Sequence, residues 1–411
     1  MPSAVEARCE LAVISMLVWN DFCNDARVLK EAQTLARNGF HVTVNAYHVP
    51  GKTMPIEVVE DGITVRRVCL SLFKRRKAIK PALSAAPRGR SVFSLLFEIL
   101  GRCRGHMELL INVIRQRPAI VHAHDVNTLP TAWLAAKLSR ARLIYDAHEI
   151  STSREGYAGL RRLVAWIEGA LMPRAHGTIT TTEARAKFFA RAYGIDRPVV
   201  LQNRPRRQLL QGGSRIRDEL RLVEPWPIVL YQGGVQQGRG LERLVRVAAL
   251  VPNAYFVFIG GGRLDASLRS IAAELMLEDR VYFIPTVALA ELPSYTASAS
   301  IGVQPIENTC LNHYTTDSNK LFEYVQAGLP VVSSDLPEIR LVVRAHELGL
   351  LVSPGDTEAL AAALRTLVDD QAKRNFHAEQ SLKAAAVLNW EEQEGKLIAL
   401  YKRVLKQKKA G

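Results

Sequence analysis

The sequence predicts an α/β protein with two domains, each built on a doubly wound parallel sheet. Short apolar runs of strand length alternate with longer helical patterns from residue 11 onward. The same alternation restarts near residue 226, after a polar stretch rich in arginine. The chain has 411 residues, which is too long for one typical core. We therefore expect two sheets, with ligands bound at the carboxyl ends of their strands in the cleft between the domains.

The first half, residues 1–205, opens with the run LAVISMLVW, which predicts a buried strand. A helix is expected over Ala26–Asn38, and a second strand after Gly39. Further strands are expected, in chain order, at Ile63–Leu70, Ala119–His124, Arg142–His148, Gly177–Thr181 and Val199–Gln202. This order of strand and helix is typical of a parallel sheet.

The hydrophobic pattern lapses over residues 206–225, which we interpret as a linker. The second domain, residues 226–385, restarts with PIVLYQGG. Its expected helices are Leu241–Leu250, Leu264–Leu277 and Thr357–Val368, and its later strands are YFVFIGGG, RVYFIPTV, SIGVQPI, the VVSS run and GLLVSPGD. Residues 386–411 contain a last helix around Trp390–Leu405, long enough to pack back on the first domain.

The net charge of +14 favours phosphorylated or anionic partners. Between Arg66 and Arg104, eleven Lys or Arg accompany one acid, Glu98, among aliphatic and aromatic residues. This segment fits either a peripheral contact with an anionic membrane or a solvated loop followed by an ordinary core helix. No motif for nucleic acid accompanies the charge, so we do not expect that partner.

The five cysteines lie at positions 9, 23, 69, 103 and 310 and include no C-x-x-C pair. Their spacing predicts neither a disulfide framework nor a metal site, as in a reduced cytosol. No apolar run approaches the roughly 20 residues of a membrane span. We therefore expect a cytoplasmic protein whose membrane contact, if any, is peripheral and on the inner face.

The most informative stretch is residues 317–335, DSNKLFEYVQAGLPVVSSD, which predicts a helix start running into a buried strand. Lys320 and Glu323 share one face of this helix, and Ser318 and Asn319 are residue types that cap a helix. Free amides and a lysine attract phosphate, whereas a carboxylate accepts bonds from sugar hydroxyls. The pattern therefore favours a sugar-nucleotide site over a solvated Lys–Glu pair.

Several fragments, in this order, resemble the retaining GT-B glycosyltransferases of the large fourth family, also called group 1. The fragments are NDARVLKEAQTLARNGFHVTV, VHAHD, IYDAHE, YQGGVQQGRGLERL, SNKLFEYVQAGLPVVSSDLPE, LLVSPGDTEALAAAL and NWEEQEGKLIALY. The resemblance spans nearly the whole chain. It implies two Rossmann-like domains, an acceptor-binding one followed by a nucleotide-sugar-binding one.

In that family, a basic pair after the first strand of the second domain grips the donor diphosphate. Arg239 matches the family lysine, whereas Gly234 stands where the family has an arginine. We expect Lys320 to compensate from the neighbouring helix. The resemblance assigns donor binding to Gly233, Gly234, Arg239, Thr286, Val287, Ser318, Asn319, Lys320, Leu321 and Glu323.

The family also has two glutamates separated by seven residues, of which Glu323 matches the second, the ribose-binding one. The first falls at Thr315, and Glu307, His313 and Asp317 are candidate substitutes. Backbone amides of residues 314–319 are a further candidate for holding the sugar.

In the first half, His148 matches the family histidine that faces the reacting sugar. We expect a neutral imidazole that donates or accepts a hydrogen bond. Acceptor binding is assigned to Asn24, Asp25, Arg27, His124 and Asp125, with helix or strand capping as the alternative for the aspartates.

The resemblance implies transfer of a hexosyl or N-acetylhexosaminyl group from a UDP- or GDP-sugar to a hydroxyl of a glycan or lipid-linked acceptor. His148, Arg239 and Lys320 are the expected catalytic residues, and neither a metal nor another cofactor is expected. Two alternatives stay open: a sugar-nucleotide 2-epimerase of the same fold, and a catalytically silent scaffold or binding subunit.

Overall fold

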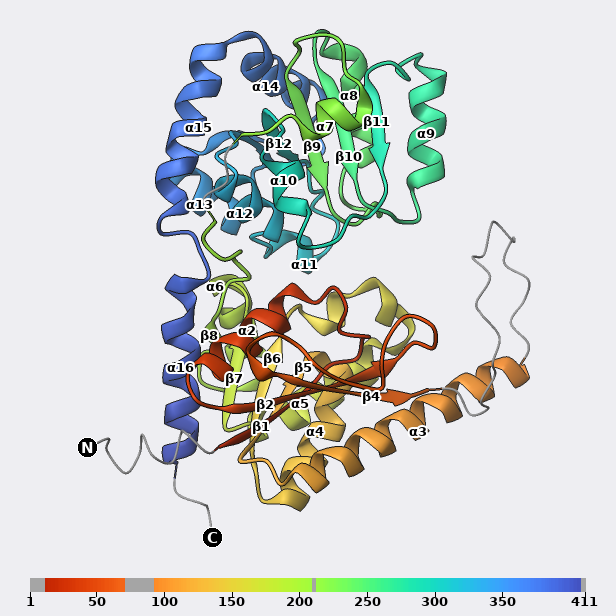
Figure 1. Cartoon of the computed structure of the whole chain (residues 1–411), viewed down its shortest axis with the longest axis vertical. Helices are drawn as coiled ribbons and strands as arrows, with labels where there is room; N and C mark the ends of the chain where they lie inside the picture. Colours follow the sequence, from red (N-terminus) through yellow and green to blue (C-terminus); the bar gives the residue numbers. More distant parts are fainter. Residues whose placement is uncertain (1–11, 71–91, 209–211, 408–411) are drawn as a thin grey trace. The chain divides into compact units, whose positions relative to one another are not determined.

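The computed structural model describes residues 12–70, 92–208 and 212–407 (Figure 1). Its contacts divide the chain into two compact units. Unit 1 is formed within residues 1–181, 185–201 and 394–411, and unit 2 within residues 182–184 and 202–393. The segment 206–225, expected as a linker, thus belongs to unit 2, and residues 394–406, which make up most of the last helix, belong to unit 1.

Unit 1 is built on an eight-stranded sheet in the order β3-β4-β2-β1-β5-β6-β7-β8. The strands are β1 Val13–Leu17, β2 His41–His48, β3 Ile56–Val58, β4 Thr64–Cys69, β5 Ile120–His124, β6 Arg142–Ala147, β7 Gly177–Thr180 and β8 Val199–Val200. All neighbours pair in parallel except β3 with β4. The sheet order reverses between β1 and β5, which is where doubly wound folds bind ligands.

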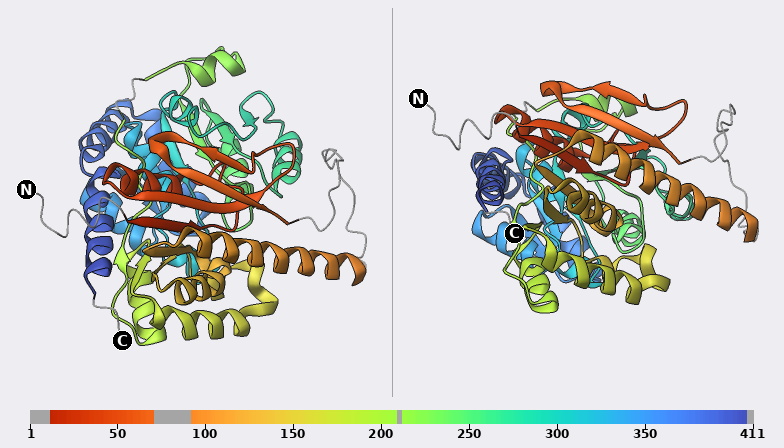
Figure 2. Two further views of the ribbon diagram at one scale, coloured as in Figure 1. Left: turned by 60° about the horizontal axis from the view of Figure 1, so that its bottom comes forward. Right: turned by 90° about the horizontal axis from the view of Figure 1, so that it is seen from below.

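Helices cover both faces of this sheet. They are α2 Ala26–Arg37, α3 Val92–Gln116, α4 Asp125–Ser139, α5 Arg161–Leu171, α6 Glu183–Tyr193 and α16 Glu391–Lys406, with short 3-10 turns at Glu60–Gly62, Ser151–Ser153, Glu155–Leu160 and Met172–Arg174. Helices α3, α4 and α5 lie side by side on one face (Figure 2). From α16, Tyr401 packs against Phe40 and His122, and Leu400 meets Gly177.

Unit 2 is built on a six-stranded parallel sheet in the order β11-β10-β9-β12-β13-β14. Its strands are β9 Ile228–Gln232, β10 Tyr255–Ile259, β11 Val281–Ile284, β12 Ile301–Gln304, β13 Val331–Ser334 and β14 Gly349–Val352. In chain order this is the 3-2-1-4-5-6 arrangement of dinucleotide-binding folds, with its reversal between β9 and β12.

Alternate residues of these strands enter two different cores, so both faces of the sheet are buried. Val229 and Tyr231 pack with helices α8, α9 and α14, whereas Ile228 and Leu230 pack with residues of α7, α10, α12, α13 and α15. The helices are α7 Arg215–Leu220, α8 Leu241–Leu250, α9 Asp265–Glu274, α10 Leu292–Thr296, α11 Leu311–Tyr314, α12 Asn319–Gln326, α13 Pro337–Ala345, α14 Thr357–Asp369 and α15 Gln371–Ala385.

The predicted parallel sheets and doubly wound order are confirmed, and the bounds of α8 agree residue for residue. The sequence did not predict the antiparallel edge strand β3 or helix α15. Of the basic segment 66–104, residues 71–91 lie outside the described part of the chain. Among the described residues, no helix has the length and hydrophobicity needed to cross a bilayer.

Candidate active site

A pocket of ≈ 170 Å³ lies in unit 1 at the carboxyl ends of β1, β5 and β6. It is lined by Val18, Trp19, Asn20, Asp25, His124, Asp125, Asn127, His148 and Arg154. The strand order reverses between β1 and β5, so the pocket occupies the switch point of the sheet. The structure thus brings together four residues that the sequence assigned to this site.

Asp25 caps helix α2 and also faces the pocket. Its carboxylate accepts the Val28 N–H at 3.2 Å and the Asn20 side-chain amide at 2.7 Å. The capping interpretation of Asp25 is therefore confirmed, whereas acceptor binding stays a prediction with which its place in the pocket lining agrees. Asn24, one residue earlier, is exposed and does not line the pocket.

His148 follows β6 and is bracketed by two carboxylates. Its Nε2 lies 3.1 Å from Asp146 Oδ2, and its Nδ1 lies 3.8 Å from Asp125 Oδ2. The His148 backbone N–H also donates to Asp125 Oδ1 at 3.3 Å. The ring is 21% exposed, so a ligand in the pocket can reach it.

Burial disfavours the charged form of His148, but the charges of Asp125 and Asp146 outweigh it and raise the pKa to about 9. The neutral imidazole expected from the sequence is therefore replaced by an imidazolium at neutral pH. Both ring nitrogens then carry protons, and His148 donates hydrogen bonds without accepting them.

Arg27, assigned to acceptor binding from the sequence, is instead buried behind the pocket. Its guanidinium donates to both oxygens of Asp146, at 2.8 and 3.0 Å, and to the Leu201 carbonyl at 2.7 Å. Its Nε also lies 3.1 Å from Glu31 Oε1. Since all of these partners lie inside the unit, Arg27 stabilises the residues behind the pocket and does not face it.

A buried cluster of Glu31, His122, His124 and Asp146 has ligand-type atoms within 4.8 Å of one another. Burial lowers the pKa of both histidines, while burial and the Asp146 charge raise the pKa of Glu31 well above its usual range. The Arg27 guanidinium already supplies the positive charge beside both carboxylates. The donor set therefore fits an ion-pair network better than a metal site.

Three polar pocket residues were missed by the sequence reasoning. Arg154 lies 3.5 Å from Asp125 and over the Tyr157 ring, and Tyr157 donates to the Asn127 side chain at 2.6 Å. Asn20 follows β1. Their positions in loops or on helix α4 leave no periodic pattern; the only available signal was their nearness to predicted strand ends.

In unit 2, the loop after β9 meets the start of α12. A Cβ on Gly233 would lie 2.7 Å from Lys320 Cε and 2.9 Å from Nζ, so the lysine side chain rests on the glycine backbone. Gly233 has a φ of 118°, which side chains rarely adopt. The Lys320 ammonium also lies 5.4 Å from the centre of the Tyr231 ring.

Lys320 is an unusual cation because it is desolvated and has a second cation nearby. Burial and then the charge of Arg239 lower its pKa to about 8, and Glu323 opposes this shift. The structure thus gathers Gly233, Arg239, Lys320 and Glu323 at the carboxyl end of β9. Two cations close enough to repel one another form a site suited to an anion.

Glu323 is half-buried on the same helix. The Gln232 amide donates to its Oε2 at 2.6 Å, and Gln232 in turn accepts from Thr296 at 2.8 Å. This chain of bonds orients the carboxylate. Leu321, also assigned to donor binding, is fully buried in the core, so only its backbone can contribute.

The start of α12 differs from the capping predicted. Ser318 occupies the N-cap position, but its side chain makes no capping bond, and its φ of 54° is strained for a serine. Asn319 is exposed as the first helical residue. Within this first turn, the Leu321 N–H donates to the Ser318 carbonyl at 3.1 Å.

The remaining donor candidates differ in position. Thr286 is exposed, and its Oγ1 would lie 3.4 Å from a Cβ on Gly261, whereas Val287 packs on the core. Gly234 is exposed in the loop after β9.

Three residues were candidates to replace the missing glutamate of the family. Glu307 forms an ion pair with Arg243 at 3.0 Å. Asp317 is buried and accepts a hydrogen bond from the Gln202 side chain at 2.9 Å. His313 lies against Gly238, the residue before Arg239.

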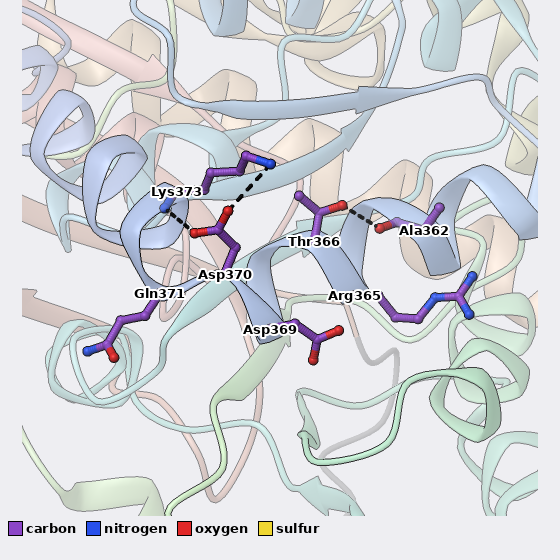
Figure 3. A pocket seen from close by; sticks show the side chains of 7 residues that line it. All are labelled: Ala362, Arg365, Thr366, Asp369, Asp370, Gln371 and Lys373. Carbon is purple, nitrogen blue, oxygen red and sulfur yellow. Dashed lines mark hydrogen bonds and ion pairs between the residues drawn. The ribbon is translucent and has the colours of Figure 1, made fainter.

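A second surface hollow, between α14 and α15, is lined by Ala362, Arg365, Thr366, Asp369, Asp370, Gln371 and Lys373 (Figure 3). Asp370 caps α15 by accepting the Lys373 N–H at 2.9 Å and pairs with its ammonium at 3.4 Å. These contacts explain Asp370 and Lys373 as parts of a helix cap. The hollow also lies away from the strand ends, so we do not take it as a functional site.

Comparison with known proteins gives matches in both halves. Residues 226–370 match the family model described as glycosyl transferases group 1, and residues 25–205 match a glycosyl transferase 4-like domain. A D-inositol 3-phosphate glycosyltransferase of Nocardia farcinica is 25% identical over 407 residues, covering 92% of this chain and 84% of the relative.

Solved structures agree with the fold. Sucrose-phosphate synthase from Thermosynechococcus elongatus superposes with a TM-score of 0.75 at 19% identity, over 95% of this chain and 98% of that one. HepE of Anabaena, solved in complex with UDP-glucose, gives a TM-score of 0.73 at 18% identity, over 94% and 98% of the two chains.

Proposed function

Because the chain belongs to the group 1 glycosyl transferases and has their GT-B fold, we propose a role for each of its half-sites. The enzyme is a retaining glycosyltransferase that uses a nucleotide-sugar donor. Unit 2 binds the donor, and the pocket of unit 1 receives the acceptor. The observation that carries this proposal is the Lys320 ammonium resting on Gly233 with the Arg239 charge nearby.

In unit 2, Lys320, Arg239 and the first amides of α12 hold the donor diphosphate. The bond between the anomeric carbon and the diphosphate oxygen breaks, so negative charge grows on the leaving group. Cations already in place stabilise that charge without reorganisation. A diphosphate oxygen takes the proton of the attacking hydroxyl on the same face of the sugar. Because the chain supplies both cations, the proposed transfer does not depend on a metal.

Glu323 holds the ribose of the donor. Gln232 occupies one carboxylate oxygen, and the second accepts bonds from ribose hydroxyls. The transferred group is a hexosyl or N-acetylhexosaminyl residue carried on UDP or GDP. The complex of HepE with UDP-glucose supports trying uridine donors first.

In unit 1, His148 donates from Nδ1 to a sugar hydroxyl. The carboxylates of Asp25 and Asp125 accept bonds from a polyhydroxylated acceptor, and the Asn127 amide donates to it. We place this acceptor among glycans and lipid-linked sugars, in polysaccharide assembly. The name of the Nocardia relative adds D-inositol 3-phosphate to the acceptors worth testing.

We also propose peripheral association with the cytoplasmic face of a membrane through α3. Leu96, Leu100, Met107 and Ile111 are exposed at spacings that fall in one sector of a helix with about 3.6 residues per turn. The other side of α3 packs through Gly101 and Gly105 on residues of the unit. An exposed apolar stripe favours the membrane interpretation over an ordinary core helix.

The proposed reaction is tested with radiolabelled UDP- and GDP-sugars, after a thermal-shift screen has ranked the donors by the stability that they add. We expect release of nucleotide and labelled product only when an acceptor is present. Formation of an epimeric sugar without an acceptor would indicate the 2-epimerase. Tight donor binding without turnover, across the acceptors tried, would indicate a binding subunit.

A further inference from the structure

Behind the pocket of unit 1, the Asp146 carboxylate is fixed by hydrogen bonds as well as by packing. It is fully buried at the end of β6, and the guanidinium of Arg27 donates to both of its oxygens. The third Arg27 bond, to the Leu201 carbonyl, fixes the guanidinium itself. A two-pronged bond of this kind sets the plane of the carboxylate as well as its position.

The carboxylate is aimed at one edge of the catalytic histidine. Asp146 Oδ2 lies 3.1 Å from His148 Nε2, and His124 Nδ1 lies 3.2 Å from the same nitrogen. The Nε2 edge therefore faces two polar groups inside the protein, of which the Asp146 carboxylate accepts the Nε2 proton. The Nδ1 edge faces Asp125, which lines the pocket.

We infer that Asp146 is a positioning residue for His148: clamped by Arg27, it holds the ring from the Nε2 side and leaves Nδ1–H as the donor that the pocket presents. The inference rests on the proposed role of His148 as the ligand-facing group of unit 1. Asp146 itself touches no ligand, because it is fully buried and does not line the pocket.

The charges around His148 agree with this assignment. Arg27 offsets Asp146, and Asp125 balances the imidazolium, so a cationic His148 leaves no excess charge in the cluster. The groups that face or surround His148 are the acids Asp25, Glu31, Asp125, Asp146 and Glu149 and the bases Arg27, His122, His124, Arg154 and Arg185. Asp146 is the fully buried acid that bonds to the ring directly.

The test is an NMR titration of the His148 ring in the full chain, with His148→Gln used for assignment. We expect a midpoint near pH 9 in the native protein. Asp146→Asn should lower that midpoint by roughly one unit or more, and Glu149→Gln, a matched change at an exposed neighbour, should leave it in place. An unchanged midpoint in folded Asp146→Asn would overturn the inference.

Two further measurements guard against a variant that does not fold. Above pH 9 in the native chain, ¹⁵N shifts should place the remaining proton of His148 on Nε2; a proton on Nδ1 would contradict the assignment. In the enzyme assay, the alkaline limb of kcat/KM should move with the NMR midpoint in Asp146→Asn. The NMR measurements need no donor or acceptor, so their failure is distinct from a failure of the proposed transfer reaction.

Discussion

At the scale of single residues, the account depends on two perturbed cations, Lys320 in unit 2 and His148 in unit 1. Their pKa values move in opposite directions because their neighbours differ. Burial lowers the pKa of both groups. At Lys320 the Arg239 charge adds to this lowering, whereas at His148 the charges of Asp125 and Asp146 outweigh it and raise the pKa. Perturbed groups at strand ends are typical of functional sites.

The pKa of Lys320 leads to a prediction for donor binding. Near pH 8, about half of the Lys320 side chains are neutral in the free protein, because the pKa is lowered to about 8. A bound diphosphate favours the charged form, so binding takes up a proton and the affinity falls as pH rises above 8. Calorimetry in two buffers of different ionisation enthalpy should detect this uptake.

The control for that measurement is Lys320→Met, in which the uptake should disappear. Lys373→Met, on the surface between α14 and α15, should retain it. If the binding enthalpy at pH 8 is the same in both buffers, and the affinity is flat from pH 7 to 9, Lys320 does not carry the diphosphate.

For residues in sequence motifs, the position in the fold was predicted correctly, but the direction of the side chain was not always. His124, Asp125 and His148 end adjacent parallel strands, and the sheet necessarily brings such ends together. Arg27 belongs to the same motif as Asp25, yet its side chain turns into the unit to meet Asp146. Closeness in sequence does not tell a side chain that faces the pocket, as in Asp25, from one that points into the interior of the unit, as in Arg27.

At the scale of elements, strongly periodic segments were predictable and weakly patterned ones were not. Helix α8 has a clear apolar face, and its bounds were predicted correctly. Helix α15 buries only Ser381 and Ala384, so it has no apolar stripe to reveal it. Strand β3 has three residues, none of them buried, and exists through its pairing with β4.

Helix α3 provides the prediction at this scale. We expect the protein to sediment with vesicles that contain anionic lipid at low salt, and less so at high salt, since salt screens the basic charges. Replacing Leu100 and Met107 together by serine should weaken binding about tenfold or more, because both side chains would lie in the lipid.

The control is Met276→Ser, at a methionine of unit 2 that is more exposed than Met107. It should bind vesicles as the native protein does. Two outcomes would contradict membrane association through the exposed apolar residues of α3. One is that the native protein does not sediment with the vesicles at low salt, and the other is that the α3 variant binds them as well as the control does.

At the scale of the whole molecule, the chain repeats one architecture with different chemistry at the strand ends. Unit 1 places acids and an imidazolium at its switch point, whereas unit 2 places two cations and an oriented carboxylate at the end of β9. The doubly wound fold of both units was predictable from the alternation of apolar runs. The clamp by Arg27 and the polar neighbours of the pocket were not, because they come from loops and side-chain directions that no period encodes.

The central claim is that Lys320 and Glu323 of α12 hold the donor, and its most direct measurement is donor turnover in two pairs of variants. Lys320→Ala and Glu323→Ala should each lower kcat/KM by roughly tenfold or more with the fold intact, because each removes a charged contact to the donor. The matched changes Lys373→Ala and Glu379→Ala, at exposed positions of α15, should leave it unchanged. Native kcat/KM in both Lys320→Ala and Glu323→Ala would contradict the account.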